Sequence, residues 1–473
     1  MNTRELALLS MHELATLVRR REVRVTELVE GYLARIDELD PQLNSYITVC
    51  REEALSAASS LDRELDNGNY RGPLHGMPIA LKDQIYTKGI RTTNGSLVFK
   101  DWVPQRDATV VRKLRDAGAV VLGKLNMSEF AIGGTRHFPF GTPRNPWNVE
   151  YTTGESSAGP GAAVAASLCA AALGEDTGGS GRYPASACGV VGLRATLGRI
   201  SRVGMRSLSW SCDMVAPMGR TVRDCALLTN AIAGDDPEDP MSVATPVPDY
   251  TRELDLGVRG MKIGVIRELF EESAISDEVR LAIENALAIY RELGATVVEV
   301  SVPAARLAAE IFVCTGDVDC AVALRDILRD HSSEIDSQTR TRLTSALLGS
   351  ALLYQTAQKA RNLLAQQMRE ALKSADVLVS ATIPDPPQKI ASFQGRFDSA
   401  ADVVQRMYRV RSSFMVYPLA RLPAVSVPCG FSTNGLPLGL QIGGGAFQEG
   451  TILRVAQALE SATDFHKQRP TVS

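Results

Sequence analysis

The stretch from Gly154 to Gly192 most constrains the fold, because it sets two serine-bearing glycine loops on either side of an alanine-rich segment. The serines are Ser156 and Ser180, which are 24 residues apart. The small side chains of Gly161–Leu173 between them are typical of a helix packed tightly inside a larger body. The glycines before Ser180 leave the backbone free to turn several N–H groups toward one point. An oxyanion hole needs that geometry.

An isolated Gly-Gly-Ser is more often a flexible turn than a functional site. Here the sequence that follows, Tyr-Pro-Ala-Ser-Ala-Cys-Gly-Val-Val-Gly-Leu at residues 183–193, is apolar and carries no charge. Such a stretch is typical of a buried core. We therefore expect the two loops to be held rigidly.

Composition restricts the class of protein. A chain of 473 residues with 45% hydrophobic and 22% charged residues has ample material for a globular core. A net charge of −3 gives no basic field for nucleic acid or an anionic membrane, so neither is an expected partner. The eight cysteines are dispersed, without CxxC pairs or cysteine–histidine metal spacing, and we expect most of them to be small buried hydrophobic residues. The N-terminus lacks an apolar leader and no run could cross a bilayer, which favours a cytoplasmic location.

Helix and strand patterns alternate along the chain and predict an α/β architecture. Helical patterns begin at the capping box Ser10–Glu13 and recur at residues 26–39, 52–65, 107–117, 221–233, 276–293, 304–372 and 451–462. Strand patterns occupy residues 79–81, 119–122, 262–266, 295–302, 377–381, 424–428 and 438–442. We expect a single domain over 1–473, with an N-terminal helical segment 1–70 and a more variable helical region at about 235–400.

The predicted strand at 79–81 delivers Lys82 and Asp83 at its end. For a lone Lys-Asp pair, a salt-bridged or snorkelling lysine is the more common explanation. A buried lysine can also serve as a base, because burial lowers its pKa, and a second serine can carry the proton from the nucleophile. That role requires Asp83 to be engaged elsewhere, since a nearby carboxylate raises the pKa of a lysine.

Two other kinds of site are disfavoured. Only five histidines are present and no GxSxG elbow surrounds either serine, so nothing points to a Ser-His-Asp triad. Residues 118–124 match most of a phosphate-binding P-loop, yet Leu125 stands where magnesium coordination requires serine or threonine. We exclude nucleotide binding on that basis.

Several motifs resemble the amidase signature family. Residues 154–159 resemble its GGSSGG loop, residues 176–180 its DTGGS loop and residues 78–83 its PIALKD strand end. Further similarity lies in Gly123–Met127, Asn145–Asn148, Gly189–Leu193, Met214–Met218 and Leu422–Pro428. The resemblance covers most of the chain and weakens between roughly 235 and 400.

This resemblance implies a fold, a reaction and a set of residues. The fold is a central mixed β-sheet covered by helices, and the reaction is amide hydrolysis through an acyl-enzyme without metal or cofactor. The implied triad is Ser-cisSer-Lys, in which Ser180 attacks the carbonyl, Ser156 after a cis peptide passes protons and Lys82 is the base. The oxyanion would be held by the Ser180 N–H together with Thr177, Gly178 and Gly179.

The sequence departs from the family pattern in both serine loops. Glu155, Ala158 and Pro160 replace two glycines and a serine of the first loop. Gly181 and Tyr183 stand where the tRNA-dependent glutamine amidotransferase subunits of the family usually have isoleucine and glutamine. Our main hypothesis is therefore hydrolysis of a small organic amide, such as an aryl amide or a carbamate. The alternative is the glutamine amidase subunit of a tRNA-dependent amidotransferase.

A third hypothesis, a degenerate binding protein, is disfavoured because all three triad residues are present. For the main hypothesis we expect a largely apolar acyl pocket. The residues assigned to it are Met127, Phe130, Tyr183, Met205 and Trp210. The expected partner is a small-molecule amide, with no nucleic acid and no membrane, and with a homodimer as the oligomer to test for.

Overall fold

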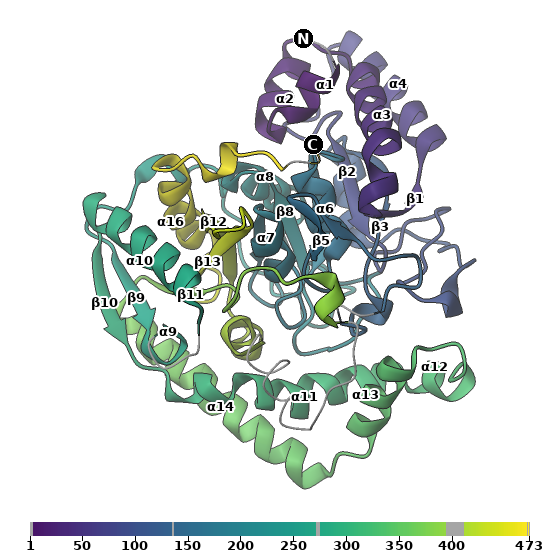
Figure 1. Ribbon diagram of the computed structural model, residues 1–473. Helices are drawn as coiled ribbons and strands as arrows, with labels where there is room; N and C mark the ends of the chain where they lie inside the picture. The colour runs from purple at the N-terminus through teal and green to yellow at the C-terminus, as the bar shows by residue number, and fades with distance from the viewer. Residues whose placement is uncertain (1–2, 135–136, 271–274, 394–410, 471, 473) are drawn as a thin grey trace.

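The computed structural model describes residues 3–134, 137–270, 275–393, 411–470 and 472. Within these residues eleven strands form one sheet in the order β1-β3-β2-β6-β8-β7-β12-β13-β11-β9-β10. Pairs β2–β3, β2–β6, β9–β10 and β9–β11 are parallel, and the other neighbours are antiparallel. Helices flank this sheet (Figure 1). The expected mixed sheet covered by helices is confirmed.

The strands of the large sheet are short, and those at its centre are buried throughout. They are β1 Tyr46–Val49, β2 Pro78–Lys82, β3 Val120–Leu125, β6 Ala171–Glu175, β7 Val191–Arg194, β8 Val215–Gly219, β9 Lys262–Ile266, β10 Thr296–Val300, β11 Val377–Ala381, β12 Ala424–Phe431 and β13 Pro437–Gly443. A separate hairpin pairs β4 Arg144–Asn145 with β5 Asn148–Thr152.

Helices surround the sheet in groups that follow the chain (Figure 1). The N-terminal group is α1 Thr3–Leu8, α2 Met11–Arg19, α3 Val25–Leu43 and α4 Arg51–Asp66. The central group is α5 Thr109–Asp116, α6 Ala158–Ala165, α7 Arg182–Cys188 and α8 Val222–Ile232. The remaining helices are α9 Arg267–Phe270, α10 Asp277–Glu292, α11 Ala308–Ala323, α12 Arg325–Asp330, α13 Ser337–Leu347, α14 Ala351–Ser374 and α16 Glu449–Ser461, with a further helical stretch at residues 411–420.

Apolar cores lie on both faces of the sheet. Helices α8, α10 and α16 pack against β7, β11, β12 and β13 in one core. Helices α7, α11 and α14, with residues 414–420, pack in another. In Figure 1 helices α11 to α14 run along the lower edge of the molecule, beyond the sheet. Among the described helices, none combines the length and the apolar character needed to cross a membrane.

The structure corrects the interpretation of Gly161–Leu173 as a single helix. Helix α6 ends at Ala165, Ser167 adopts a left-handed conformation with φ of 56°, and Ala171 begins strand β6. This strand is buried between β2 and β8, where small side chains suit a central strand as well as a helix. The capping box at Ser10–Glu13 is present at the start of α2, as predicted.

The topology brings three strand ends to one edge of the sheet. Strands β2 and β6 are parallel, with Leu81 opposite Leu173, so that their carboxyl ends meet. Strand β8 runs antiparallel to β6 and pairs Val215 with Glu175, so the residues just before β8 reach the same edge. Lys82, Glu175 and Asp213 are thereby placed together by the backbone.

Candidate active site

The two serine loops lie against each other at this edge. The Glu155–Ser156 peptide bond is cis. The backbone N–H of Ser157 donates to the carbonyl of Ser180 at 3.4 Å, and the Ser157 hydroxyl bonds both the N–H and the carbonyl of Glu175 at 3.1 and 3.0 Å. The first loop is therefore fastened to the second loop and to the end of β6.

Lys82 joins the first loop to the sheet. Its Nζ donates to Ser156 Oγ at 2.7 Å and to Glu175 Oε2 at 2.8 Å, and Lys82 and Glu175 are fully buried. Burial lowers the pKa of Lys82, while the neighbouring Glu175 opposes that shift. A lysine in this position can exchange a proton with Ser156.

Asp83, the residue after Lys82, faces another lysine. Its Oδ2 accepts the backbone N–H of Thr93 at 2.7 Å, and its Oδ1 lies 3.7 Å from Nζ of Lys124. Burial lowers the pKa of Lys124 to about 8. Asp83 is thus engaged elsewhere, and Glu175 is the carboxyl group that contacts Lys82.

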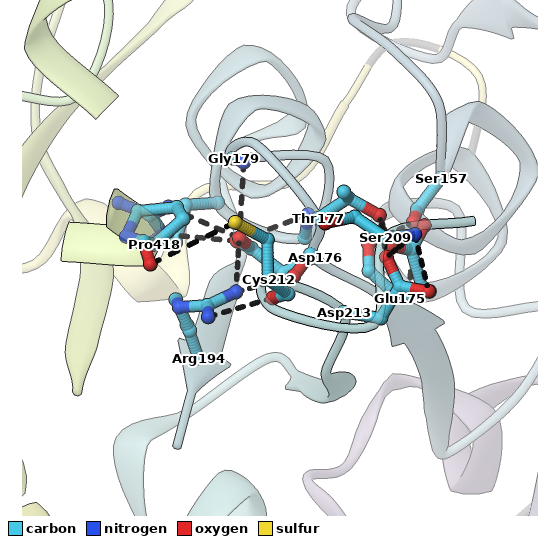
Figure 2. A network of polar contacts seen from close by, with 12 residues as sticks. Ser157, Glu175, Asp176, Thr177, Gly179, Arg194, Ser209, Cys212, Asp213 and Pro418 are labelled. Carbon is cyan, nitrogen blue, oxygen red and sulfur yellow. Dashed lines mark hydrogen bonds and ion pairs between the residues drawn. The ribbon is translucent and has the colours of Figure 1, made fainter. Parts of the chain in front are cut away.

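The second loop is held by an ion-pair cluster at Asp176 (Figure 2). Arg182 Nε donates to Asp176 Oδ2 at 2.9 Å, and Arg194 Nη1 lies 3.2 Å from Oδ1, with all three side chains fully buried. Burial raises the pKa of Asp176, but the two guanidinium groups overcome this and hold it at about 2. This cluster explains the rigidity expected of the loop.

Gly179, one residue of the expected oxyanion hole, contacts the side chain of Asp176. The backbone N–H of Gly179 donates to Asp176 Oδ1 at 3.0 Å, so this N–H is already engaged. Gly179 has a φ of +116°, and a Cβ built there would lie 2.2 Å from Phe414 Cδ2. Glycine at this position is therefore required by conformation and packing.

A cavity opens beside Ser180. Its polar wall is formed by two ion pairs: Arg342 Nη2 lies 2.6 Å from Asp317 Oδ1, and Arg411 Nη2 lies 3.5 Å from Glu155 Oε1. Its apolar wall includes Tyr183, whose ring stacks on that of Phe414 with centroids 5.8 Å apart. The rest of the lining is Ala131, Ile132, Gly134, Thr177, Gly178, Gly179, Leu208, Phe312, Cys320 and Met415.

Of the five predicted pocket residues, only Tyr183 lines this cavity. Met127 lies beneath Gly95, and Phe130 packs edge-on against Phe99 in a neighbouring apolar cluster. Met205 pairs with Ile85 in an isolated bridge. Trp210 is 53% exposed and contacts the Arg421 guanidinium. Met127, Phe130 and Met205 are buried in the packing around the site, Trp210 is exposed, and charged side chains line the cavity.

Sequence reasoning missed the charged residues of the site. Glu175 follows the apolar run Ala171–Gly174, the same pattern that singled out Lys82, but the run was assigned to a helix. Asp317, Arg342 and Arg411 come from the helical region after residue 235, where no motif marked them. Among the described residues, no group of three or more histidine, cysteine, aspartate or glutamate side chains could hold a metal ion.

Comparison with known proteins identifies the class of enzyme to which the chain belongs. The model of the family described as Amidase matches residues 27–453. The chain belongs to the amidase family, and it is a hydrolase of carbon–nitrogen bonds in amides.

Particular relatives are similar over nearly the whole chain. The A subunit of the glutamyl-tRNA(Gln) amidotransferase of Geobacter metallireducens is 41% identical, over 98% of this chain and 99% of its own length. The crystal structure of the corresponding A subunit from Thermotoga maritima superposes with a TM-score of 0.85 at 32% identity, covering 99% of this chain and 98% of that one. The peptide amidase of Stenotrophomonas maltophilia superposes equally well, with a TM-score of 0.85 at 32% identity and 98% coverage of both chains.

These relatives overturn the expected partners. We expected a small-molecule amide, no nucleic acid and at most a second copy of the chain. Relatives at 40–41% identity are named as the A subunit of a glutamyl-tRNA(Gln) amidotransferase, so their names include both a subunit letter and a tRNA. The net charge of −3 misled the prediction because it describes the chain alone, whereas a subunit can share its contacts with a partner.

Proposed function

We propose that this chain is the glutamine-hydrolysing subunit of a tRNA-dependent amidotransferase. It would release ammonia from the side-chain amide of glutamine, for use on a tRNA-bound substrate in an assembly with partner subunits. The similarity to the A subunits of glutamyl-tRNA(Gln) amidotransferases supports this alternative over a small organic amide. A tRNA-bound substrate also favours the cytoplasmic location predicted from the sequence.

The polar wall of the cavity is the observation that carries the proposal. Free glutamine has an α-carboxylate and an α-ammonium group in addition to its side-chain amide. Arg342 with Asp317, and Arg411 with Glu155, offer one cation and one anion each beside Ser180. A guanidinium can bind the α-carboxylate and a carboxylate the α-ammonium group. A neutral aryl amide or carbamate would bring no charged group to bind either the guanidinium groups or the carboxylates of this wall.

The proposed reaction follows the contacts of Lys82. Neutral Lys82 takes the proton of Ser156, which takes the proton of Ser180 as its Oγ attacks the amide carbonyl. Backbone N–H groups of Gly178 and Ser180 would stabilise the negative oxygen. The proton then returns through Ser156 to the leaving nitrogen, and the carbon–nitrogen bond breaks to give ammonia. Water then attacks the acyl-Ser180 ester while Ser156 and Lys82 take its proton. A proton returns to Ser180 Oγ as the ester bond breaks and glutamate is released.

The test compares the chain alone with the chain co-expressed with the other subunits of a bacterial glutamyl-tRNA(Gln) amidotransferase. We expect a stable complex that converts glutamyl-tRNA(Gln) to glutaminyl-tRNA(Gln) with glutamine as the nitrogen donor. The matched control is the complex made with Ser180→Ala, supplied with glutamine or with ammonia. Ammonia should restore conversion if only the glutamine step is lost. Failure to form any complex would contradict the proposal.

A small organic amide remains the second candidate because of one observation. The stacked rings of Tyr183 and Phe414 form an apolar wall of the cavity, and Tyr183 departs from the residue usual in amidotransferase subunits. The structural similarity to a peptide amidase agrees with this candidate. Comparing kcat/KM for glutamine with that for a benzyl or anilide amide separates the two, because only the first uses the charged wall.

A further inference from the structure

The buried polar network continues beyond Lys82. Glu175 Oε2 accepts from Lys82, and its other oxygen contacts the hydroxyl of Thr177. The same hydroxyl lies 2.7 Å from Asp213 Oδ1. Figure 2 shows Glu175, Thr177 and Asp213 connected in this order. An unbroken line of hydrogen bonds therefore runs from Ser156 through Lys82 to Asp213.

The Thr177 hydroxyl limits the charge that this line can carry. A hydroxyl has a single proton to donate, but here it lies between two carboxyl oxygens. If both carboxyl groups were ionised, one buried oxygen would face the hydroxyl oxygen without a proton between them. Such a contact is costly in a buried site. One of the two carboxyl groups must therefore carry a proton.

The donors around Asp213 decide which carboxyl group it is. Asp213 accepts from the Ser207 hydroxyl at 2.8 Å, from the Leu208 N–H at 2.6 Å and from the Ser209 N–H at 3.0 Å, in addition to Thr177. Multiple donors stabilise an ionised carboxylate. The carboxyl group of Glu175 hydrogen-bonds only Lys82 and Thr177 among the described residues. The proton therefore belongs on Glu175, which donates it to Thr177.

We propose that Asp213, acting through the Thr177 hydroxyl, keeps the Glu175 carboxyl group protonated, so that the amine of Lys82 faces a neutral acid and remains free to accept the proton of Ser156. Compared with an ion pair, one proton has moved from Lys82 Nζ to Glu175 and no other bond changes. Glu175 and Asp213 are positioning residues in this scheme. The inference rests on the role proposed above for Lys82.

Burial favours protonation of both carboxyl groups, so the number of donors around each decides between them. Burial raises the pKa of Glu175, with the nearby Asp213 adding to the shift and Lys82 opposing it. Burial also raises the pKa of Asp213, against its hydrogen bonds. Asp176, the remaining carboxylate near Lys82, is kept ionised by Arg182 and Arg194. Two buried carboxyl groups that share one hydroxyl thus hold one proton between them.

Infrared spectroscopy tests the protonation state without relying on activity. A difference spectrum of the native chain minus Glu175→Gln, at neutral pH, should show the carbonyl stretch of a protonated carboxylic acid. The matched control is Glu268→Gln, at the distant β9 end of the sheet. Glu268 is buried, and its hydrogen bonds to Ser301 and Val302 lower its pKa, so its removal should not change that region. If the native chain instead shows a carboxylate band that is absent from Glu175→Gln, Glu175 is ionised, and that result would overturn the proposal.

A rescue experiment tests the consequence for Lys82. Asp213→Asn should let Glu175 ionise and keep Lys82 protonated. The rate at which a fluorophosphonate labels Ser180 falls on the acidic side of the pH profile, and this acidic limb should then lie at higher pH than in the native chain. For each pH unit by which the limb moves upward, the labelling rate measured at a fixed acidic pH should fall about tenfold. The double variant Glu175→Gln/Asp213→Asn should return the limb to lower pH and recover most of the lost rate.

A double variant no faster than Asp213→Asn would contradict the proposal. If Asp213→Asn fails to fold, the infrared difference still decides the protonation of Glu175. If the native chain is never labelled at Ser180, the proposed catalytic role fails, and the infrared result again stands by itself.

Discussion

Lys82 Nζ lies 2.7 Å from Ser156 Oγ at the end of a strand whose residues are all buried. The strand brings the lysine to a fully buried position, and the loop that carries Ser156 is fastened to the adjacent strand by Ser157. Burial lowers the pKa of the lysine, and the neighbouring Glu175 opposes that shift. The proposed catalysis depends on this pair.

Replacing Lys82 should abolish most activity. Without its base, Lys82→Ala should lose about a hundredfold to ten-thousandfold in kcat, a range typical for a general base. Ser156→Ala should also cost heavily, and the double variant should be little worse than the worse single one because the residues act as a unit. Steady-state kinetics on each purified variant provides the measurement.

The matched control is Lys124→Ala, which removes the other fully buried lysine of this sheet edge. It should lower stability more than activity per folded molecule, as judged by urea unfolding beside kinetics. Near-native turnover by folded Lys82→Ala, or strictly additive losses in the double variant, would show that the relay is assigned wrongly.

Activity should fall as the pH is lowered. Burial lowers the pKa of Lys82, so the neutral amine is present above that pKa and is converted to ammonium as the pH drops through it. The logarithm of kcat/KM should then decrease with a slope of about one per pH unit on the acidic side. A rate that increases toward acidic pH would require a different base.

Arg342 should matter for glutamine more than for neutral amides. Removing one partner of a buried charge contact costs several kcal/mol, so Arg342→Ala should lower kcat/KM for glutamine by about a hundredfold. For an uncharged amide of similar size the loss should be severalfold at most. Arg340→Ala is the control on the same helix, because Arg340 binds the Ser332 carbonyl and does not line the cavity. Equal losses for both substrates would argue against the charged wall as the glutamine site.

Asp176 should contribute strongly to stability. Asp176→Asn leaves Arg182 and Arg194 buried without their anion, which should cost about 3–5 kcal/mol of unfolding free energy. Because its folded pKa of about 2 lies below the ordinary aspartate value, the stabilisation is present at neutral pH and is lost as the pH falls toward 2.

Urea unfolding of the native chain and of Asp176→Asn, at neutral pH and at about pH 3, measures this effect. The difference between the two proteins should shrink in acid. A constant difference would place the stabilisation in groups other than the Asp176 carboxylate.

The sequence was sufficient for the position of Lys82 and for seven of the eleven strands in the large sheet, but not for β1, β6, β7 and β8. An apolar run that ends in a charged residue predicts a strand that delivers that residue to an edge, and Lys82 follows this pattern. The alanine-rich segment before Glu175 was assigned to a helix because small residues suit both a helix and a central strand. As a result, the carboxyl neighbour of Lys82 was missed.

The cavity wall could not be predicted in the same way. Arg342 and Arg411 come from separate helical stretches, and only the packing of those stretches around Ser180 brings them together. The five apolar pocket residues were chosen from segments close to the motifs in sequence. Four of them instead lie outside the cavity lining, where they pack against the surrounding structure or are exposed.

The most direct test of the proposed mechanism is mass spectrometry of the protein quenched during turnover with glutamine. We predict an acyl adduct on the peptide that contains Ser180, present in the native chain, diminished by hydroxylamine with formation of the γ-glutamyl hydroxamate, and absent from Ser180→Ala. Undiminished glutamine hydrolysis by Ser180→Ala, with no adduct on the native chain, would contradict the mechanism.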